Sequence, residues 1–242
     1  MFKKNTLSFI FLLLLSVLIT GCPKKDDQVI TQKISISTKK NSVKSLNNAS
    51  KEKPSKTEYE NLMLVNKEHK IPADFIPNLT DVGNGFKFDE NAAQYLTAML
   101  TDANKDGINL FIISSYRSTE RQSQNFNNNV NKLKALGLSE QDAYNETTKY
   151  FAEPGFSEHS IGLAVDLNSL EPSFENTKEF NWLQNNAATY GFILRYPKNK
   201  EDVTKIAYEP WHYRYVGKKH ALIITSKHLT LEEYLQNINN NK

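Results

Sequence analysis

The sequence predicts an α+β fold built as one domain. Helical hydrophobic patterns fill the first part of the folded region, and short apolar segments rich in β-branched residues cluster in its later part. This separation of helices from strands along the chain is typical of the α+β class. The region from residue 58 to residue 242 is long enough for one domain with a substantial core, and it contains no internal repeat.

The first expected elements are three helices. The first begins at Asp89, because the apolar residues after it recur on one helical face. Those residues are Ala92, Leu96, Met99, Leu100 and Ala103. Ser118 is expected to cap a second helix over 119–136, and Ser139 to begin a third helix that ends near Ala152.

Strands dominate the later part. The expected strands comprise residues 108–114, 162–167, 192–196 and 211–216. We expect the strand Ile108–Ser114 to be buried, because the run is apolar and β-branched. In the last strand, three aromatic residues alternate with His212 and Arg214, which predicts one aromatic face packed in the core. A helix over 177–190 lies between the strands, and Thr230 with Glu233 forms a capping box for a last short helix that ends near Gln236.

The N-terminal residues resemble a secretion signal. Lys3 and Lys4 precede an apolar run that is about a dozen residues long, which is shorter than the roughly 20 residues of a membrane-spanning helix. The run leads into Leu-Ile-Thr-Gly-Cys, which resembles a bacterial lipobox ending at Cys22. We therefore expect residues 1–21 to be removed as a lipoprotein signal peptide. An ordinary signal peptide with an incidental cysteine is the alternative.

Cys22 is the only cysteine, so an intramolecular disulfide and a cysteine-ligated metal site are excluded. A lipobox cysteine carries a diacylglyceryl group, and two acyl chains meet the requirement for stable membrane anchoring. We expect lipidation at Cys22 to place the domain outside the cytoplasm, anchored to a bacterial membrane and facing the cell wall. Pro23 follows the cysteine and gives no clear sorting cue, so the type of envelope stays open.

Residues 22–57 are expected to form a flexible tether. They are mainly Lys, Ser, Asn, Thr and Gln, and such a segment cannot bury enough apolar surface to offset its ordering entropy. Its mean span is roughly 30–35 Å. The formal net charge is +3, and removal of residues 1–21 takes away Lys3 and Lys4 and no acid, which leaves +1. This charge gives no basis for a nucleic-acid partner.

Two short segments contain the residues with the clearest chemistry. Residues 157–166 include His159 and Asp166, which are seven positions apart with a glycine between, and residues 209–212 include Glu209 and His212. A catalytic zinc site needs three nitrogen or oxygen ligands, an open position for water and a carboxylate that handles protons. The two histidines and Asp166 are candidate Zn²⁺ ligands, and Glu209 is the candidate general base and acid.

Spacing alone leaves a structural role open for each of these residues, because a single histidine or carboxylate is more often a surface group or a satisfied core group. The surrounding sequence supplies more. Its motifs are Ser-Ser-Tyr-Arg-Ser at 114–118, Ser-Glu-His with Gly-Leu-Ala-Val-Asp-Leu in 157–167, Gly-Phe-Ile-Leu-Arg-Tyr at 191–196, and Glu-Pro-Trp-His within 206–217. A weaker match lies within 64–77.

Together these motifs resemble the VanY-like D-alanyl-D-alanine carboxypeptidases of the LAS metallopeptidase superfamily, which includes related L,D-carboxypeptidases of peptidoglycan. The resemblance covers residues 64–237. It implies a small zinc peptidase with helices around a central, mainly antiparallel sheet. It also implies that His159, Asp166 and His212 bind the zinc ion and that Glu209 is the catalytic acid and base. The expected substrates are peptidoglycan stem peptides.

Three further residues are expected to contact the substrate. Arg117 suits a free C-terminal carboxylate, because a guanidinium donates two parallel hydrogen bonds and keeps its charge. By resemblance Arg117 also polarises the scissile carbonyl, and Gln122 and Ser157 contact the peptide. The alternatives are an arginine in a surface salt bridge, an exposed helix glutamine and a serine that caps a local turn. Glu158 either orients a histidine ligand or faces solvent.

The expected function is a zinc-dependent carboxypeptidase that removes the terminal D-alanine from stem peptides by means of metal-activated water. The bond is of the L,D type in a tetrapeptide and of the D,D type in a pentapeptide, with a slight preference here for L,D. Two alternatives remain, a peptidoglycan endopeptidase of the same superfamily and a non-catalytic wall-binding lipoprotein. We expect a monomer.

Overall fold

The computed structural model describes residues 61–240. The expected signal peptide, the lipidation site Cys22 and the tether over 22–57 therefore lie outside the described residues. Within residues 61–240 the chain forms seven α-helices and two antiparallel sheets, so the predicted α+β class is confirmed. None of the helices in this part of the chain combines the length and the apolar character needed to cross a membrane.

The larger sheet has four strands in the order β3-β4-β6-β5, and every neighbouring pair is antiparallel. These strands are β3 (Ile112–Ser114), β4 (Ala164–Leu167), β5 (Phe192–Leu194) and β6 (His212–Tyr215). The smaller sheet pairs β1 (Leu79–Asp81) with β2 (Lys87–Asp89). Strands β4 and β6 are therefore the central pair of the larger sheet, as the prediction of a central antiparallel sheet requires.

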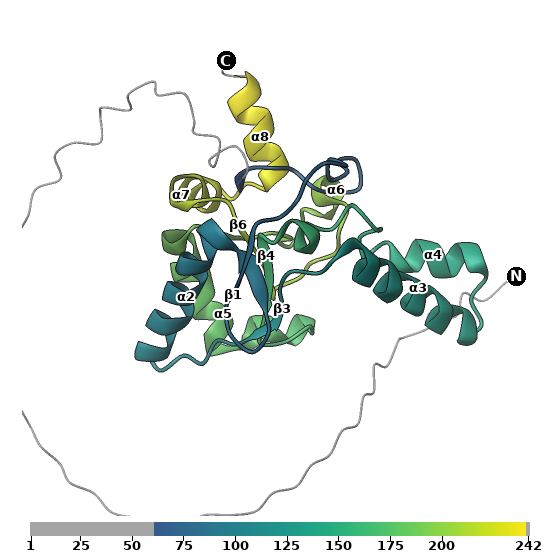
Figure 1. Ribbon diagram of the computed structural model, residues 1–242, viewed down its shortest axis with the longest axis horizontal. Coiled ribbons are helices and arrows are strands. Elements are labelled where there is room, and N and C mark those ends of the chain that lie inside the picture. Colours follow the sequence, from purple (N-terminus) through teal and green to yellow (C-terminus); the bar gives the residue numbers. More distant parts are fainter. Residues whose placement is uncertain (1–60, 241–242) are drawn as a thin grey trace, which may run out of the picture. The chain divides into compact units, whose positions relative to one another are not determined.

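Helices surround the larger sheet. They are α2 (Glu90–Lys105), α3 (Thr119–Ala135), α4 (Glu140–Thr147), α5 (Lys178–Asn186), α6 (Glu201–Thr204), α7 (Lys218–Ser226) and α8 (Leu231–Asn240). Three short 3₁₀ helices join them, namely η1 (Glu158–Ile161), η2 (Pro172–Asn176) and η3 (Ala187–Tyr190). Figure 1 shows α2, α5 and α7 gathered on one side of the sheet and the α3–α4 pair projecting from the other side.

Most helix starts lie where the capping residues predict them. The side chain of Asp89 accepts hydrogen bonds from two amides of the first turn of α2, and Ser118 and Ser139 each accept one at the starts of α3 and α4. Thr230 and Glu233 form the expected reciprocal capping box. The ends are less well predicted, because α4 ends at Thr147 rather than near Ala152 and α8 continues to Asn240.

The expected buried strand over 108–114 is wrong in length and in burial. Only Ile112–Ser114 is a strand, and β3 pairs with β4 on one side alone, at the edge of the sheet. Phe111 is 45% exposed and Ile113 is 38% exposed. An apolar run in a sequence predicts a strand, but it does not show whether another part of the chain covers the faces of that strand.

The register of the central strands separates an apolar face from a polar face. Val165 is opposite Tyr213, and Asp166 is opposite His212. Because side chains alternate along a strand, Val165, Tyr213 and Tyr215 share the face that packs into the main core with α2 and α5. The aromatic face expected in the last strand is thus confirmed. Asp166 and His212 lie on the opposite face of the same strands.

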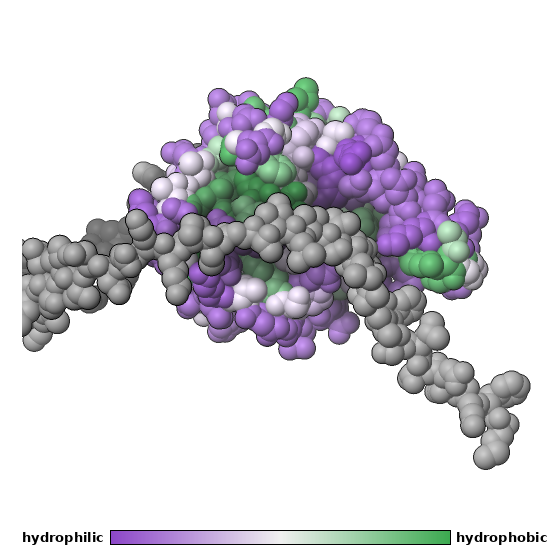
Figure 2. Space-filling view, turned by 90° about the horizontal axis from the view of Figure 1, so that it is seen from below, coloured by the Kyte–Doolittle hydropathy of each residue, from purple (hydrophilic) through white to green (hydrophobic). Residues whose placement is uncertain are grey.

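The outer surface agrees with this separation. On the face shown in Figure 2, hydrophilic residues dominate and hydrophobic residues gather near the middle. Inside, two hydrophobic clusters are buried, one around the apolar face of the sheet with α2 and one between Ile193, α7 and α8. The second cluster attaches the C-terminal helix to the sheet.

Gly191 should be the least replaceable glycine at a helix end. It follows η3 with φ +94°, and a Cβ built on it would lie 2.6 Å from the Tyr215 ring and 3.1 Å from backbone atoms of Gly217 and Lys218. Gly137 after α3 has a similar φ of +98°, but nothing lies within 4 Å of its Cβ position. We expect Gly137→Ala to cost about 1–2 kcal/mol for the left-handed backbone. Gly191→Ala should cost roughly 1–3 kcal/mol more through overpacking.

Denaturant unfolding of the two variants measures this difference directly. Because the two φ angles are similar, the difference in the free energy of unfolding reports mainly on the crowding at Gly191. Equal losses in the two variants would contradict the close packing of η3 against β6.

Candidate metal and catalytic site

The polar face of the central strand pair supplies two side chains of the site. Asp166 on β4 and His212 on β6 are direct cross-strand partners, and both are buried. Opposite residues in an antiparallel pair have their Cβ atoms about 4.5–5.5 Å apart. His212 Nδ1 and Asp166 Oδ1 accordingly lie 3.0 Å apart. The sheet register therefore fixes this half of the site.

His159 reaches the same place from the 3₁₀ helix η1. Its backbone carbonyl accepts a hydrogen bond from the Arg117 amide at 3.1 Å, and its ring Nδ1 lies 2.7 Å from the Ser115 carbonyl oxygen. A carbonyl can only accept, so Nδ1 carries the proton and Nε2 has its lone pair available. Nε2 lies 3.2 Å from Asp166 Oδ2. The turn at Gly162 then leads the chain from η1 into β4.

The three side chains predicted as ligands therefore converge. One atom from each of His159, Asp166 and His212 lies within 4.8 Å of the others, and the two rings are perpendicular with centroids 4.9 Å apart. Asp166 Oδ1 is buried without a hydrogen-bond partner among residues 61–240, although His212 Nδ1 is close. Two imidazole nitrogens and a carboxylate are a donor set that Zn²⁺ prefers. A buried acceptor without a donor fits a bound cation.

Glu209 stands beside this cluster in the turn that enters β6. Its amide donates to the Tyr196 carbonyl, and its carbonyl accepts from the His212 amide, so the backbone is held on both sides. Its carboxylate lies 3.6 Å from His212 Nδ1. Burial raises the pKa of Glu209 to about 8 against the opposing effect of His212. A buried carboxylate with a raised pKa next to a metal cluster is suited to accept and return a proton.

The charges around the two histidines differ. Burial lowers the pKa of His159. Burial also lowers the pKa of His212, but the nearby carboxylates of Asp166 and Glu158 outweigh it and raise that pKa to about 9. The negative charges of these carboxylates therefore stabilise a positive charge at His212. A proton on the ring or a bound divalent cation can supply that charge.

Arg117 lies at the edge of the cluster in a fixed position. Nη1 donates to Gln122 Oε1 at 2.8 Å, and Nη2 donates to Ser114 Oγ at 3.2 Å. Burial lowers the pKa of Arg117, while the negative charges of Asp166 and Glu209 raise it. Arg117 has no carboxylate partner at salt-bridge distance among the described residues, so its guanidinium charge is available to a ligand.

The positions of Gln122 and Ser157 do not match the alternatives of an exposed helix glutamine and a serine that caps a local turn. Gln122 is 1% exposed, so it is no exposed helix glutamine, and its amide donates to the Ala152 carbonyl while its oxygen holds Arg117. Ser157 is buried at the start of η1, and its hydroxyl makes no capping hydrogen bond. Their contacts with a peptide stay a prediction.

Several buried residues near the site were missed in the sequence. Tyr196 packs on the His212 ring with centroids 4.8 Å apart, and Arg195 and Arg214 are fully buried. Alternation in β6 places Arg214 on the same face as His212, so that arginine could have been found from the pattern. Glu158 is 1% exposed, which excludes the solvent-facing alternative.

Comparisons with known proteins agree with one another. The profile of a family described as VanY, D-alanyl-D-alanine carboxypeptidase, matches residues 85–218. The putative carboxypeptidase YodJ of Bacillus subtilis (strain 168) is 42% identical over 195 residues, which cover 73% of this chain and 67% of that protein. A D-alanyl-D-alanine carboxypeptidase of Enterococcus faecalis is 39% identical over 174 residues, which cover 72% of this chain and 65% of that protein. The matches thus span about two thirds of these relatives.

Solved structures of similar proteins have folds that resemble the fold of this chain. A variant of the vancomycin resistance D,D-pentapeptidase VanY, solved in complex with Zn(II), has a TM-score of 0.67 and 38% identity, covering 73% of this chain and 99% of that one. The LdcB LD-carboxypeptidase has a TM-score of 0.64 and 41% identity, covering 73% of this chain and 86% of that one. Both similarities extend over most of the described residues.

Proposed function

Because the chain belongs to the VanY family of D-alanyl-D-alanine carboxypeptidases, we propose that it is a zinc-dependent carboxypeptidase that removes the terminal D-alanine from peptidoglycan stem peptides. The observation that carries this proposal is the convergence of three buried ligand side chains with Glu209 beside them. His159, Asp166 and His212 would hold the ion. A VanY structure in complex with Zn(II) supports zinc as the metal.

Different residues of the chain carry out different parts of the hydrolysis. When bound, zinc acts as a Lewis acid that lowers the pKa of water from 15.7 to about 7. Glu209 takes the proton from the attacking water and then delivers a proton to the leaving amine nitrogen. Arg117 binds the negatively charged end of the peptide and, with Gln122 holding its guanidinium, keeps the scissile bond in place. The buried position of these groups strengthens their electrostatic effect.

The choice of bond is open to experiment. The structural neighbours include both a D,D-pentapeptidase and an LD-carboxypeptidase, so similarity supports either specificity. A terminal carboxylate is common to both substrates, and Arg117 would bind it in either case. We propose tetrapeptide trimming as the first specificity to test.

Incubation with purified tetrapeptide and pentapeptide muropeptides tests the proposal. We expect mass spectrometry to detect loss of one alanine in the presence of zinc, with the tetrapeptide as the preferred substrate. A chelator should abolish the reaction, because the bound ion is the group that lowers the pKa of the attacking water, and added zinc should restore it. Magnesium, which prefers oxygen ligands, is the matched control and should not restore activity.

Two other outcomes would replace the proposal. Release of a whole stem peptide, rather than of one alanine, would identify an endopeptidase of the same superfamily. Binding of muropeptide by the purified, zinc-loaded protein without any cleavage would identify a wall-binding protein that has kept the fold.

We also propose that the domain works outside the cytoplasm as a monomer, tethered to a bacterial membrane through lipidated Cys22. The basis is the sequence, in which Lys3 and Lys4 precede an apolar run that ends at the sole cysteine. Such a tether would keep the domain near peptidoglycan. Metabolic labelling with a fatty acid, followed by loss of the label in Cys22→Ser, tests this location.

A further inference from the structure

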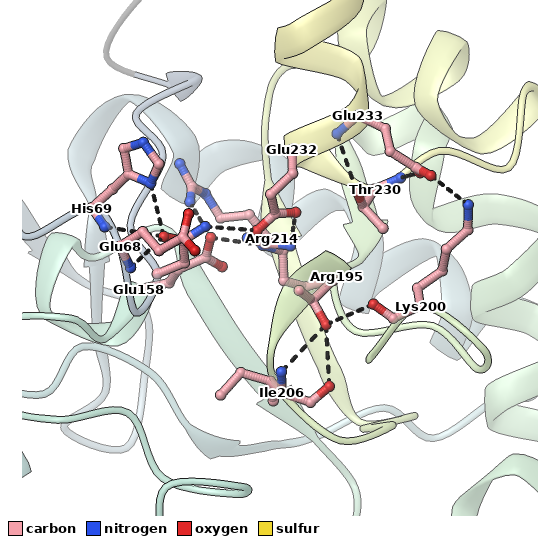
Figure 3. A network of polar contacts seen from close by, with 12 residues as sticks. Glu68, His69, Glu158, Arg195, Lys200, Ile206, Arg214, Thr230, Glu232 and Glu233 are labelled. Carbon is pink, nitrogen blue, oxygen red and sulfur yellow. Dashed lines mark hydrogen bonds and ion pairs between the residues drawn. The ribbon is translucent and has the colours of Figure 1, made fainter. Parts of the chain in front are cut away.

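A network of four buried charges lies behind His212 on the polar side of the sheet. Glu158, Arg195 and Arg214 have fully buried side chains, and the side chain of Glu232 is 13% exposed. Figure 3 shows Glu158, Arg195, Arg214 and Glu232 gathered in one network of polar contacts. The four residues come from η1, from the position directly after β5, from β6 and from α8. Their charges balance within the network.

The two oxygens of Glu158 have different surroundings. Oε1 accepts hydrogen bonds from Arg195 Nε at 2.8 Å and from Arg214 Nη1 at 2.7 Å. Oε2 is buried without a hydrogen-bond partner among residues 61–240, and it lies 3.6 Å from His212 Nε2. That ring nitrogen is also buried and also lacks a partner in the described part of the chain. The two unpaired atoms therefore face each other across a small gap.

The two nitrogens of the His212 ring thus face opposite groups. Nδ1 lies 3.0 Å from Asp166 Oδ1, within the candidate metal cluster, and Nε2 faces Glu158. A neutral imidazole has one N–H and one lone pair, so the partner of one nitrogen decides which nitrogen can bind a metal. A carboxylate that accepts a proton from Nε2 leaves the lone pair on Nδ1.

We propose that Glu158 is a positioning residue that holds the His212 ring with Nε2 protonated, so that Nδ1 binds the metal. The inference rests on the proposed function, because it needs His212 to be a metal ligand. His159 has a separate partner, the Ser115 carbonyl, so the two ligand rings are oriented by different groups. Partners of this kind fix the ring and increase the basicity of the metal-binding nitrogen.

The arginines explain how a carboxylate keeps its charge in this position. Oε1 of Glu158 accepts hydrogen bonds from the guanidinium groups of both Arg195 and Arg214, and these two positive charges stabilise the ionised carboxylate in its buried position. Both donate to the same oxygen, so the carboxylate cannot rotate without breaking two hydrogen bonds to charged groups. Oε2 is thereby directed at His212.

The arginines are themselves anchored to distant parts of the chain. Arg195 donates two parallel hydrogen bonds to Glu232 on α8, at 2.9 and 2.6 Å. Arg214 donates to the carbonyl oxygens of Asn61 and Met63. Buried ion pairs are often no more stabilising than apolar residues of the same size, so hydrophobic packing would serve a purely structural purpose equally well. A role in directing Glu158 accounts for charges at this place.

Glu158→Gln is the decisive variant, because the arginines determine how the new amide must lie. They can only donate, so the amide oxygen must face them and the NH₂ group must face His212 Nε2. An NH₂ group donates to Nε2 and favours the tautomer with its proton on Nδ1, where the metal should bind. We expect zinc affinity, measured by competition with a chromophoric chelator, to fall about 10- to 100-fold. We also expect a changed visible spectrum of the Co²⁺-substituted protein.

Two matched variants separate positioning from stability. Glu232→Gln weakens the same network but leaves the contact between Glu158 and His212, so it should lower the unfolding temperature with a much smaller loss of zinc affinity. Glu233→Gln changes the next residue, which pairs with Lys200 and Thr230 and not with the network, and should bind zinc like the wild type. Equal losses of affinity in Glu158→Gln and Glu232→Gln would assign the effect to stability and overturn the inference.

A measurement on the wild type keeps the test independent of folding in the variants. In the zinc-loaded protein, nitrogen-15 NMR of the His212 ring should find a proton on Nε2 and zinc on Nδ1. Zinc on Nε2, or wild-type affinity in Glu158→Gln, would overturn this inference and leave the proposed function intact. A wild-type protein that binds no zinc would overturn both.

Discussion

Replacement of Glu209 by glutamine is expected to lower kcat by about 10²- to 10⁴-fold, which is the usual contribution of a general acid and base. Glutamine has nearly the same shape and can still form hydrogen bonds, but it cannot take a proton from water or return one to the leaving nitrogen. Glu209 is buried with its carboxylate 3.6 Å from His212 Nδ1, the ring nitrogen that lies in the candidate metal cluster. Glu158 is also buried, but its carboxylate lies 3.6 Å from the other ring nitrogen, Nε2.

The same variant should keep its metal, because Glu209 is not among the three converging ligands. Zinc content and D-alanine release are therefore measured on one preparation. Glu201→Gln is the matched control, since Glu201 is an exposed residue at the start of α6, and it should leave both quantities unchanged. Full turnover in Glu209→Gln would exclude the proposed mechanism, and loss of zinc would make Glu209 a ligand instead.

Replacement of Arg117 by methionine is expected to reduce kcat/KM by roughly 30- to 4,000-fold, which corresponds to about 2–5 kcal/mol for truncating one partner of a buried charge pair. The guanidinium is fixed by Ser114 and Gln122 and has no carboxylate partner of its own among the described residues. The terminal carboxylate of a stem peptide would supply that partner. Arg117→Lys should recover only part of the loss, because an ammonium cannot donate two parallel hydrogen bonds.

Arg121→Met provides the comparison, since Arg121 lies in the first turn of α3, is exposed, and its guanidinium donates a hydrogen bond to Gln124. It should behave like the wild type. The second measurement compares a stem peptide with a free C-terminus and one with an amidated C-terminus. Wild type should strongly prefer the free acid, and Arg117→Met should lose that preference. An unchanged preference would mean that another group binds the carboxylate.

The sequence predicted most accurately the features that depend on residues close together in the chain. The capping side chains of Asp89, Ser118 and Ser139 act within one turn, so they mark helix starts correctly without knowledge of the fold. The convergence of His159 with Asp166 and His212 needed more, because spacing cannot tell which strands pair. It was expected from the resemblance to a family, and the β4–β6 register provides its physical cause.

What the sequence could not predict depends on contacts between distant segments. The position of Glu158 could not be predicted from its neighbours in sequence, because the two arginines that bind it are distant in the chain. Arg195 follows β5 and is held by Glu232 of α8, and Arg214 lies in β6. The burial of Ile108–Ser114 was predicted wrongly for a similar reason. Whether an apolar strand lies at the centre or the edge of a sheet is decided by the strands beside it.

The cross-strand pairing of Asp166 with His212 has a consequence for the lifetime of the folded protein. Any opening that parts β4 from β6 also separates two of the proposed ligands, so the ion can bind tightly only while the centre of the sheet is closed. By mass action, a ligand present at 1,000 times its dissociation constant stabilises the closed state by about 4.1 kcal/mol. Zinc supply would then control how often the sheet opens and how long the protein survives proteolysis, in addition to whether it is active.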